Sequence, residues 1–151
     1  MNRRTFTAGL AAFSSAAILA GRGTTAAPRK PTAGNDAARA AQLISAIRQA
    51  AGLPPVSVDR KLTAAAEYQA RSVAAAGSLS HGDFAGRVRS FGIAGAVAEN
   101  LAYGSDDVAG AIAQWQGSAP HQANLLMAGA RRIGLGRADS GSTRYWALVI
   151  G

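Results

Sequence analysis

Residues 133–150 read IGLGRADSGSTRYWALVI, and this stretch decides the fold class. Two apolar runs, 133–138 and 145–150, flank a polar turn at residues 139–142, which predicts a β-hairpin. Between residues 35 and 127, most segments place small apolar residues at helical spacing. Helices first and a hairpin last predict an α+β domain, in which helices cover a small, mostly antiparallel sheet.

Upstream of the hairpin, apolar spacing and stop residues predict a series of helices. The first runs from a cap at Asn35 or Asp36 to about Ala51, and the second covers 60–76, between a cap at Asp59 and a stop at Gly77. The remaining helices are predicted at 83–91, 108–116 and 120–127. Residues 96–102 are predicted to form a short strand or an extended wall of a cleft.

Residues 1–26 have the layout of an export signal. Arg3 and Arg4 precede a mildly apolar run at 8–20, which resembles a twin-arginine signal peptide, and cleavage is expected after Ala26. The apolar run is shorter than the ~20 residues that span a bilayer, so no membrane span is expected in the mature protein. Residues 27–36 are predicted to be a linker and 37–151 the folded domain. The protein is predicted to be exported, either to the periplasm or to the extracellular space.

The charge balance is basic and the chain has no cysteine. Lys and Arg number 16 against 8 Asp and Glu, and residues 27–151 keep 13 basic residues against all 8 acidic ones. This excess favours anionic partners. No nucleic-acid-binding motif is present, so we expect a lipid, a glycan or another cell-envelope ligand, and no nucleic acid.

His81 and His121 are the two histidines of the chain, and Glu99 lies between them in an apolar context. A buried carboxylate needs donors or a cation, so Glu99 is either a structural acceptor or a ligand-binding group. Two imidazoles and one carboxylate would also suffice for a zinc ion whose fourth position is left to water.

Other polar and aromatic positions have structural interpretations. Trp115 is expected in the core, and Gly134 and Gly136 are expected to let a helix pack closely over a strand. Ser118 is predicted to cap the helical turn that follows it, because it lacks the Gly-x-Ser-x-Gly context of a nucleophile. The amide of Asn100 is expected to hold the backbone, with ligand contact as the alternative.

Several of these segments, in this order, resemble one protein family. The segments are AGLPPVSVDRKLTAAAEYQA at 51–70, SH at 80–81, AENLAYG at 98–104, WQGSAPHQANLL at 115–126, IGLGRA at 133–138 and YWALVIG at 145–151. Over residues 37–151 the chain resembles the bacterial branch of the CAP superfamily, which includes cysteine-rich secretory, antigen-five and pathogenesis-related proteins and is also known as the SCP domain.

The resemblance implies a three-layer α-β-α sandwich with a cleft lined by two histidines and two glutamates. His81, Glu99 and His121 match three of these positions, and Ser118 stands where the second glutamate is usual. The expected cleft or ligand-binding residues are therefore His81, Glu99, Asn100, Ser118 and His121, and the expected metal ligands are His81 and His121.

Two functions follow from this cleft. The favoured one is a non-catalytic, extracytoplasmic binding module. The alternative is a zinc-dependent hydrolase, in which His81 and His121 hold the metal and Glu99 is a further ligand or the general base. Because the second glutamate is missing, we favour the binding module over an enzyme.

Overall fold

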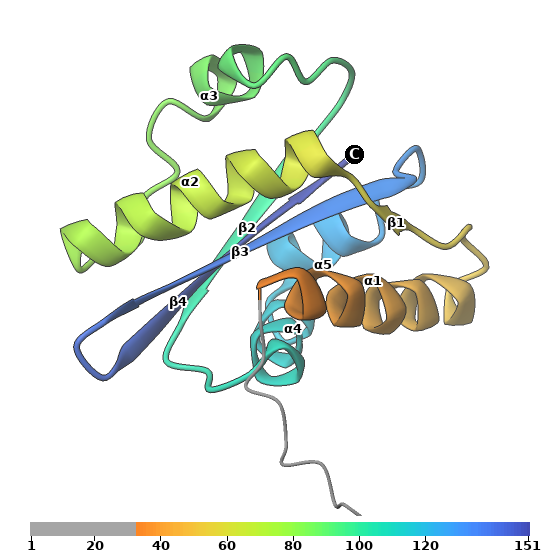
Figure 1. Ribbon diagram of the computed structural model, residues 1–151. Coiled ribbons are helices and arrows are strands. Elements are labelled where there is room, and N and C mark those ends of the chain that lie inside the picture. Colours follow the sequence, from red (N-terminus) through yellow and green to blue (C-terminus); the bar gives the residue numbers. More distant parts are fainter. Residues whose placement is uncertain (1–32) are drawn as a thin grey trace, which may run out of the picture.

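The computed structural model of the chain describes residues 33–151, which form a four-stranded sheet between two layers of helices (Figure 1). The predicted signal peptide and residues 27–32 of the predicted linker lie outside the described residues. The elements are α1 (Ala33–Ala50), β1 (Ser57–Val58), α2 (Arg60–Ala76), α3 (Phe84–Ser90), β2 (Ala98–Tyr103), α4 (Val108–Gln116), α5 (Ala119–Leu125), β3 (Arg132–Ser140) and β4 (Thr143–Ile150).

The sheet has the strand order β1-β3-β4-β2. The short β1 runs parallel to β3, whereas β3 with β4 and β2 with β4 are antiparallel pairs. The predicted hairpin is confirmed, and β2 lies at an edge with β4 as its sheet partner. The candidate site depends on this edge position.

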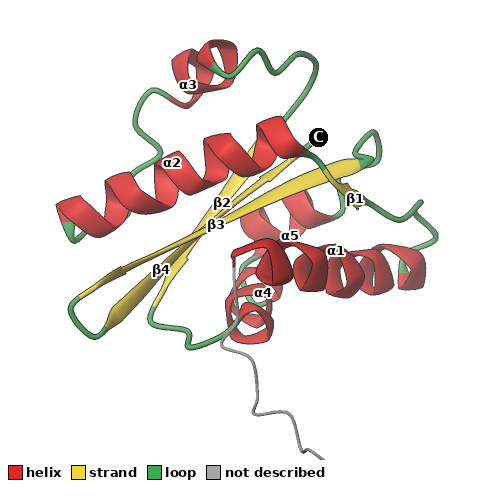
Figure 2. Ribbon diagram, in the orientation of Figure 1, coloured by secondary structure: helices red, strands yellow, loops and turns green. Residues whose placement is uncertain are grey.

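Side chains of β4 alternate between two cores, one on each face of the sheet. Trp146 and Leu148 pack in the core beneath α1, α4 and α5, whereas Ala147 and Val149 pack beneath α2 and α3. Figure 2 shows α2 crossing one face of the sheet, with α1, α4 and α5 on the other. The predicted α-β-α sandwich with a mostly antiparallel sheet is therefore confirmed.

Helix α2 begins and ends where its sequence predicts. Asp59 Oδ1 accepts hydrogen bonds from the backbone N–H groups of Lys61, at 2.8 Å, and Leu62, at 3.0 Å. Gly77 ends the helix in the left-handed conformation, with φ of 66°. The buried face of α2 packs directly over the glycines of β3.

Most predicted boundaries differ from the observed ones by one or two residues, and two larger differences involve ion pairs. Helix α1 begins at Ala33, so residues 33–36 of the predicted linker are helical, and Asp36 forms an ion pair with Arg137 at 2.8 Å instead of capping. The hairpin turn is also shorter than predicted, because pairing continues through Asp139 and Arg144, whose side chains form an ion pair at 2.8 Å. In both cases an ion pair between distant or cross-strand residues lies in the added part of the element.

None of the helices within residues 33–151 is both long and apolar enough to cross a bilayer.

Candidate ligand-binding site

Strand β2 directs two neighbouring candidate residues to opposite faces of the sheet, because successive side chains of a strand alternate. Glu99 lies on the same face as Leu101, which packs in the core beneath α2 and α3. Asn100 points to the other face, toward α5, and is fully buried. Glu99 and Asn100 therefore serve opposite sides of an edge strand.

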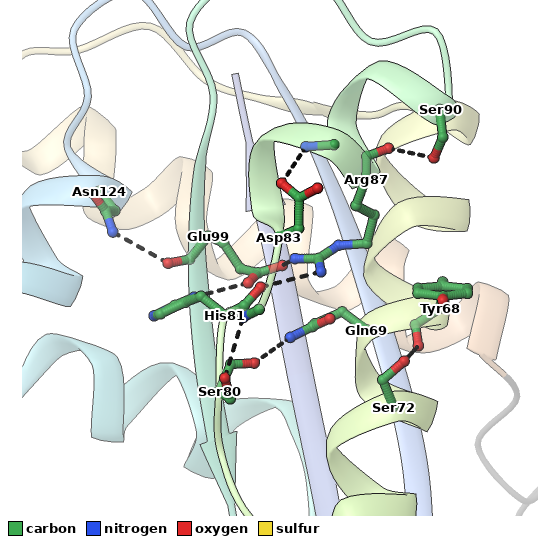
Figure 3. A network of polar contacts seen from close by, with 12 residues as sticks. Tyr68, Gln69, Ser72, Ser80, His81, Asp83, Arg87, Ser90, Glu99 and Asn124 are labelled. Atoms are coloured by element: carbon green, nitrogen blue, oxygen red, sulfur yellow. Dashed lines mark hydrogen bonds and ion pairs between the residues drawn. The ribbon is translucent and has the colours of Figure 1, made fainter.

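Glu99 is buried and both of its carboxylate oxygens are engaged. Its side chain is 1% exposed, Oε1 lies 2.8 Å from His81 Nδ1, and Oε2 accepts a hydrogen bond from Arg87 Nη2. Arg87 also donates from Nη1 to the main-chain oxygen of His81, at 3.3 Å. We call His81, Arg87 and Glu99 the His81 network, and Figure 3 shows its three side chains converging between α3 and β2.

His81 is the exposed member of this network. Its side chain is 54% exposed, and with Nδ1 directed at Glu99 the other ring nitrogen, Nε2, is left for solvent or a ligand. Two hydrogen bonds hold the loop that carries His81. Gln69 Nε2 donates to the main-chain oxygen of Ser80, and Ser80 Oγ accepts from the backbone N–H of Gly82 at 3.2 Å. An exposed imidazole is thus held in a defined orientation.

Arg87 was not among the residues expected from the sequence. It lies in α3, its side chain is 7% exposed, and it supplies the positive charge that a buried carboxylate requires. The sequence does contain a weak signal for it, since Glu99 in an apolar segment demands a cation and the helix before it contains arginines. Only the fold shows that Arg87, not the exposed Arg89, meets Glu99.

On the other face, Asn100 joins β2 to α5. Its Nδ2 donates to the main-chain oxygen of His121 at 3.0 Å, and its Oδ1 accepts from Asn124 Nδ2 at 2.8 Å. His121 is half-buried, and within residues 33–151 its imidazole has no hydrogen-bond partner. Ser118 occupies the cap position of α5 without a side-chain capping bond. The structure therefore brings His81 to Glu99 and links Asn100 to the backbone of His121.

The edge of β2 is covered by helix side chains. The main-chain oxygens of Glu99, Leu101 and Tyr103 accept hydrogen bonds from side chains of α4 and α5. The donors, in the same order, are Asn124 Nδ2 at 3.4 Å, Trp115 Nε1 at 3.0 Å and Gln114 Nε2 at 3.2 Å. Trp115 is fully buried, as expected, and its ring nitrogen has a specific partner. Covering the edge in this way removes a template for strand pairing with another chain.

The residues do not assemble a complete metal shell. Within the described part of the chain, no group of three or more His, Cys, Asp or Glu side chains is placed to hold a metal ion. Both carboxylate oxygens of Glu99 already contact His81 or Arg87. The protein ligands left for a metal ion are therefore the ring nitrogens of His81 and His121. A metal held by these two histidines would have to take its remaining ligands from water or from a bound molecule.

Comparisons with known proteins agree with this architecture. The family model of the cysteine-rich secretory protein family, CAP, matches residues 41–150. A search of curated proteins finds no match.

Three bacterial structures have a similar fold. An outer surface protein from Borrelia burgdorferi aligns with a TM-score of 0.71 and 19% identity, over 82% of this chain and 96% of that one. A cysteine-rich secretory protein from Staphylococcus aureus aligns with a TM-score of 0.67 and 19% identity, over 78% of this chain and 38% of that one. An extracellular SCP-domain protein from Bacillus anthracis aligns with a TM-score of 0.69 and 20% identity, over 83% of this chain and 45% of that one.

This chain spans nearly all of the Borrelia protein and less than half of each of the other two. At these identities the structural likeness shows the fold. The family model covers most of the chain, and so the chain belongs to the cysteine-rich secretory protein (CAP) family.

Proposed function

We propose that this chain is an exported, non-catalytic binding module of the cell envelope, with His81 as the side chain that meets its ligand. Two kinds of observation support export. Residues 1–26 have the pattern of a twin-arginine signal, and two similar structures are described as an outer surface protein and an extracellular protein. No sequence feature distinguishes the periplasm from the extracellular space as the destination.

The observation that carries the proposal is the state of Glu99. A general base must present a free oxygen to water or substrate, within hydrogen-bond reach of the proton it removes. Glu99 is 1% exposed, with one oxygen on His81 and the other on Arg87, so it presents neither oxygen to solvent. It acts instead as a positioning residue that orients the exposed imidazole of His81. This arrangement favours recognition over catalysis.

The ligand that fits the charge of the domain is anionic. Residues 27–151 carry 13 basic against 8 acidic residues, which favours acidic lipid headgroups or acidic glycans through the same negative charge. To separate these sources, binding of the full-length chain is measured with phosphatidylglycerol vesicles and, separately, with polygalacturonate. Phosphatidylcholine vesicles are the uncharged control.

His81→Ala is compared with wild type in each titration. Because the basic leader is the same in both proteins, only the difference between them reports on His81. The proposal is supported if binding to one probe is salt-sensitive and is weaker for His81→Ala. The probe that binds then identifies the anion as a lipid headgroup or a glycan. Equal binding by both proteins, or no binding to either probe, overturns the role of His81.

A zinc-dependent hydrolase is the second candidate. One contact favours a metal: a carboxylate on one ring nitrogen of a histidine commonly orients the other nitrogen toward a metal ion, as Glu99 does for His81. A bound zinc would supply Lewis-acid chemistry, with His81 and His121 as the protein's nitrogen ligands. The incomplete shell makes this candidate weaker than the binding module.

Zinc titration calorimetry near neutral pH separates the candidates. Wild type is compared with His81→Ala and His121→Ala, since a two-histidine site must lose affinity in both variants. Stoichiometric binding that disappears in both would support the metal site and justify tests of hydrolysis with Glu99→Gln as control. Absence of binding by wild type would retire the hydrolase.

A further inference from the structure

A groove outside the His81 network lies between α2 and α3, and it encloses about 700 Å³. Tyr68, Ser72 and Ala76 line it from successive turns of α2, and Ser90 and Phe91 line it from the end of α3. Among the residues of the His81 network, Arg87 alone lines this groove. Its size is within the range of small-ligand sites, roughly 300–1,000 Å³.

An exposed aromatic pair forms one wall of the groove. Tyr68 is 52% exposed, and its ring meets Phe91 edge-to-face with the ring centroids 6.1 Å apart. The contact with Phe91 orients Tyr68 while about half of the residue stays open to solvent. Figure 3 shows Tyr68 and Ser72 beside each other on α2. A rigid ring of this kind offers a flat apolar face at low entropic cost, with a hydroxyl group at its end. Such a face suits the apolar side of a sugar ring.

The polar groups of the groove keep both unused acceptors and unused donors. Ser72 Oγ donates to the main-chain oxygen of Tyr68 at 3.0 Å, and Ser90 Oγ donates to that of Arg87 at 2.8 Å, so both hydroxyl oxygens can still accept. Ser80 Oγ accepts from Gly82, so its hydrogen is still available to donate. The groove can therefore pair with groups that donate and with groups that accept.

Two charged groups of opposite sign add to this set. Asp83 Oδ1 accepts from the backbone N–H of Gly86 at 2.7 Å, and within residues 33–151 its Oδ2 has no hydrogen-bond partner. Arg87 Nε is buried and likewise lacks a partner in the described part of the chain. Because Arg87 already forms an ion pair with Glu99, the carboxylate of Asp83 is the charge that the groove offers to a ligand, and the groove does not select an anion.

This pattern discriminates between ligand classes. A hydrocarbon chain would cover Asp83 Oδ2 without pairing it, and leaving one polar group unpaired costs about 1–3 kcal/mol. It would also leave the remaining hydrogen-bonding capacity of the serine hydroxyls unused. A polyhydroxylated ring pairs with donors and acceptors together and lays its apolar face on an aromatic ring. We infer that the groove between α2 and α3 binds a neutral oligosaccharide, with one sugar ring stacked on Tyr68 and its hydroxyl groups paired with Ser72 and Asp83.

This second site is independent of the anion that we propose for His81. The test is a ¹H–¹⁵N NMR titration of the full-length chain with three neutral trisaccharides: chitotriose, cellotriose and maltotriose. We expect saturable shift changes in α2 and α3 with at least one of them. Tyr68→Ala should weaken that binding by about tenfold, the loss typical of one aromatic contact. Ser72→Ala should weaken trisaccharide binding by a smaller factor. Because alanine has a high helix propensity, this variant should keep α2 folded.

Two controls make the result specific. Tyr103→Ala removes another exposed tyrosine, 57% exposed at the end of β2, and should leave trisaccharide binding unchanged. His81→Ala should also leave it unchanged, so the two proposals fail or succeed separately. The inference is overturned if none of the three trisaccharides binds saturably, or if Tyr68→Ala binds as wild type does. The inference is also overturned if palmitate, and none of the trisaccharides, causes saturable shift changes in α2 and α3.

Discussion

Gly134 of β3 lies directly against the backbone of α2 at Leu62. A Cβ atom added at Gly134 would lie 2.0 Å from the carbonyl carbon of Leu62 and 2.0 Å from the backbone nitrogen of Thr63. Gly136 meets Ala66 in the same way one turn later, with 2.3 Å to its carbonyl carbon. The α2 layer can lie on the sheet only because this face of β3 carries no side chains at these two positions.

Gly134→Ala should therefore destabilise the fold strongly. The added methyl group meets backbone, which cannot rotate away, so α2 would have to shift from the sheet. We expect a loss of about 3 kcal/mol or more in the free energy of unfolding, measured by urea denaturation. Gly129→Ala is the matched control, because a Cβ there meets nothing within 4 Å. Equal stability of the two variants would contradict the close packing described.

Arg48 is a second point on which the fold depends. It is fully buried, and its guanidinium donates to four main-chain oxygens, those of Pro54, Leu125, Met127 and Ala130, each at 2.9 Å. Burial lowers the pKa of Arg48 from its usual range.

Arg48→Met fills much of the same volume but removes the donor of all four oxygens. Those of Met127 and Ala130 keep another donor, the backbone N–H of Ala130 and Arg131 Nη1, whereas those of Pro54 and Leu125 lose the donor that Arg48 supplies. We expect a loss of about 3 kcal/mol in the free energy of unfolding, since one unpaired buried group costs roughly 1–3 kcal/mol. Arg39→Met, on the exposed side of α1, is the control and should change stability by less than about 0.5 kcal/mol. If thermal denaturation shows the same stability for the two variants, the hydrogen bonds of Arg48 do not hold residues 125–130 in place.

Glu99→Gln tests the positioning of His81. The amide keeps the shape of the side chain but removes the charge that faces the buried Arg87. Because breaking a buried ion pair leaves one charge uncompensated, we expect a loss of about 3 kcal/mol in stability. Glu67→Gln, which alters a surface pair with Arg71 at 4.0 Å, should cost almost nothing.

Glu99→Gln should also change the populations of the two neutral tautomers of His81. In the wild type an ionised Glu99 only accepts hydrogen bonds, which favours the hydrogen on Nδ1 of the neutral ring. In Glu99→Gln the two tautomers should become closer in population, as read from ¹⁵N NMR of the imidazole. An unchanged tautomer ratio would remove the positioning role of Glu99.

Asp59 should make the stability of the protein depend on pH. Hydrogen bonds from the backbone N–H of Leu62 first, and then of Lys61, lower the pKa of its carboxyl group from the ordinary value of 3.8, against an opposing effect of burial. A carboxyl group whose pKa is lower in the folded state stabilises the protein above the unfolded pKa. That stabilisation is lost as the pH falls through the folded pKa.

Asp59→Asn keeps a capping oxygen but does not titrate. Between about pH 5 and about pH 2, wild type should therefore lose more stability than Asp59→Asn, by an amount on the order of 1 kcal/mol. Urea denaturation at several pH values measures the difference. Parallel curves for the two proteins would show that the cap does not contribute to acid sensitivity.

Export can be tested on residues outside the described part of the chain. Replacing both Arg3 and Arg4 by lysine keeps the charge but removes the paired arginines that a twin-arginine signal requires. The double variant should accumulate unprocessed in the cytoplasm, whereas wild type should be recovered outside the cytoplasm and cleaved after Ala26. Cell fractionation and intact-mass measurement report both features. Unimpaired export of the variant would argue for a general secretory signal instead.

Much of the secondary structure was decided by local sequence. Asp59 and Gly77 bound α2 because a cap and a left-handed stop act within one helical turn of the residues they affect. The alternation along 145–150 likewise predicts a strand with side chains directed to two cores. The family follows from short motifs in order, and the expectation of Trp115 in the core needs only helical spacing.

Long-range contacts were decided by the tertiary structure. Arg87 meets Glu99 only after α3 folds back over β2, and no local pattern distinguishes Arg87 from Arg89. Asn100 and Glu99 are neighbours in sequence, but their side chains point to opposite faces of the sheet, and only the fold shows which partner each one meets. The groove between α2 and α3 has no sequence motif at all. Spacing and capping depend on residues a few positions apart, whereas a site depends on which distant surfaces pack together.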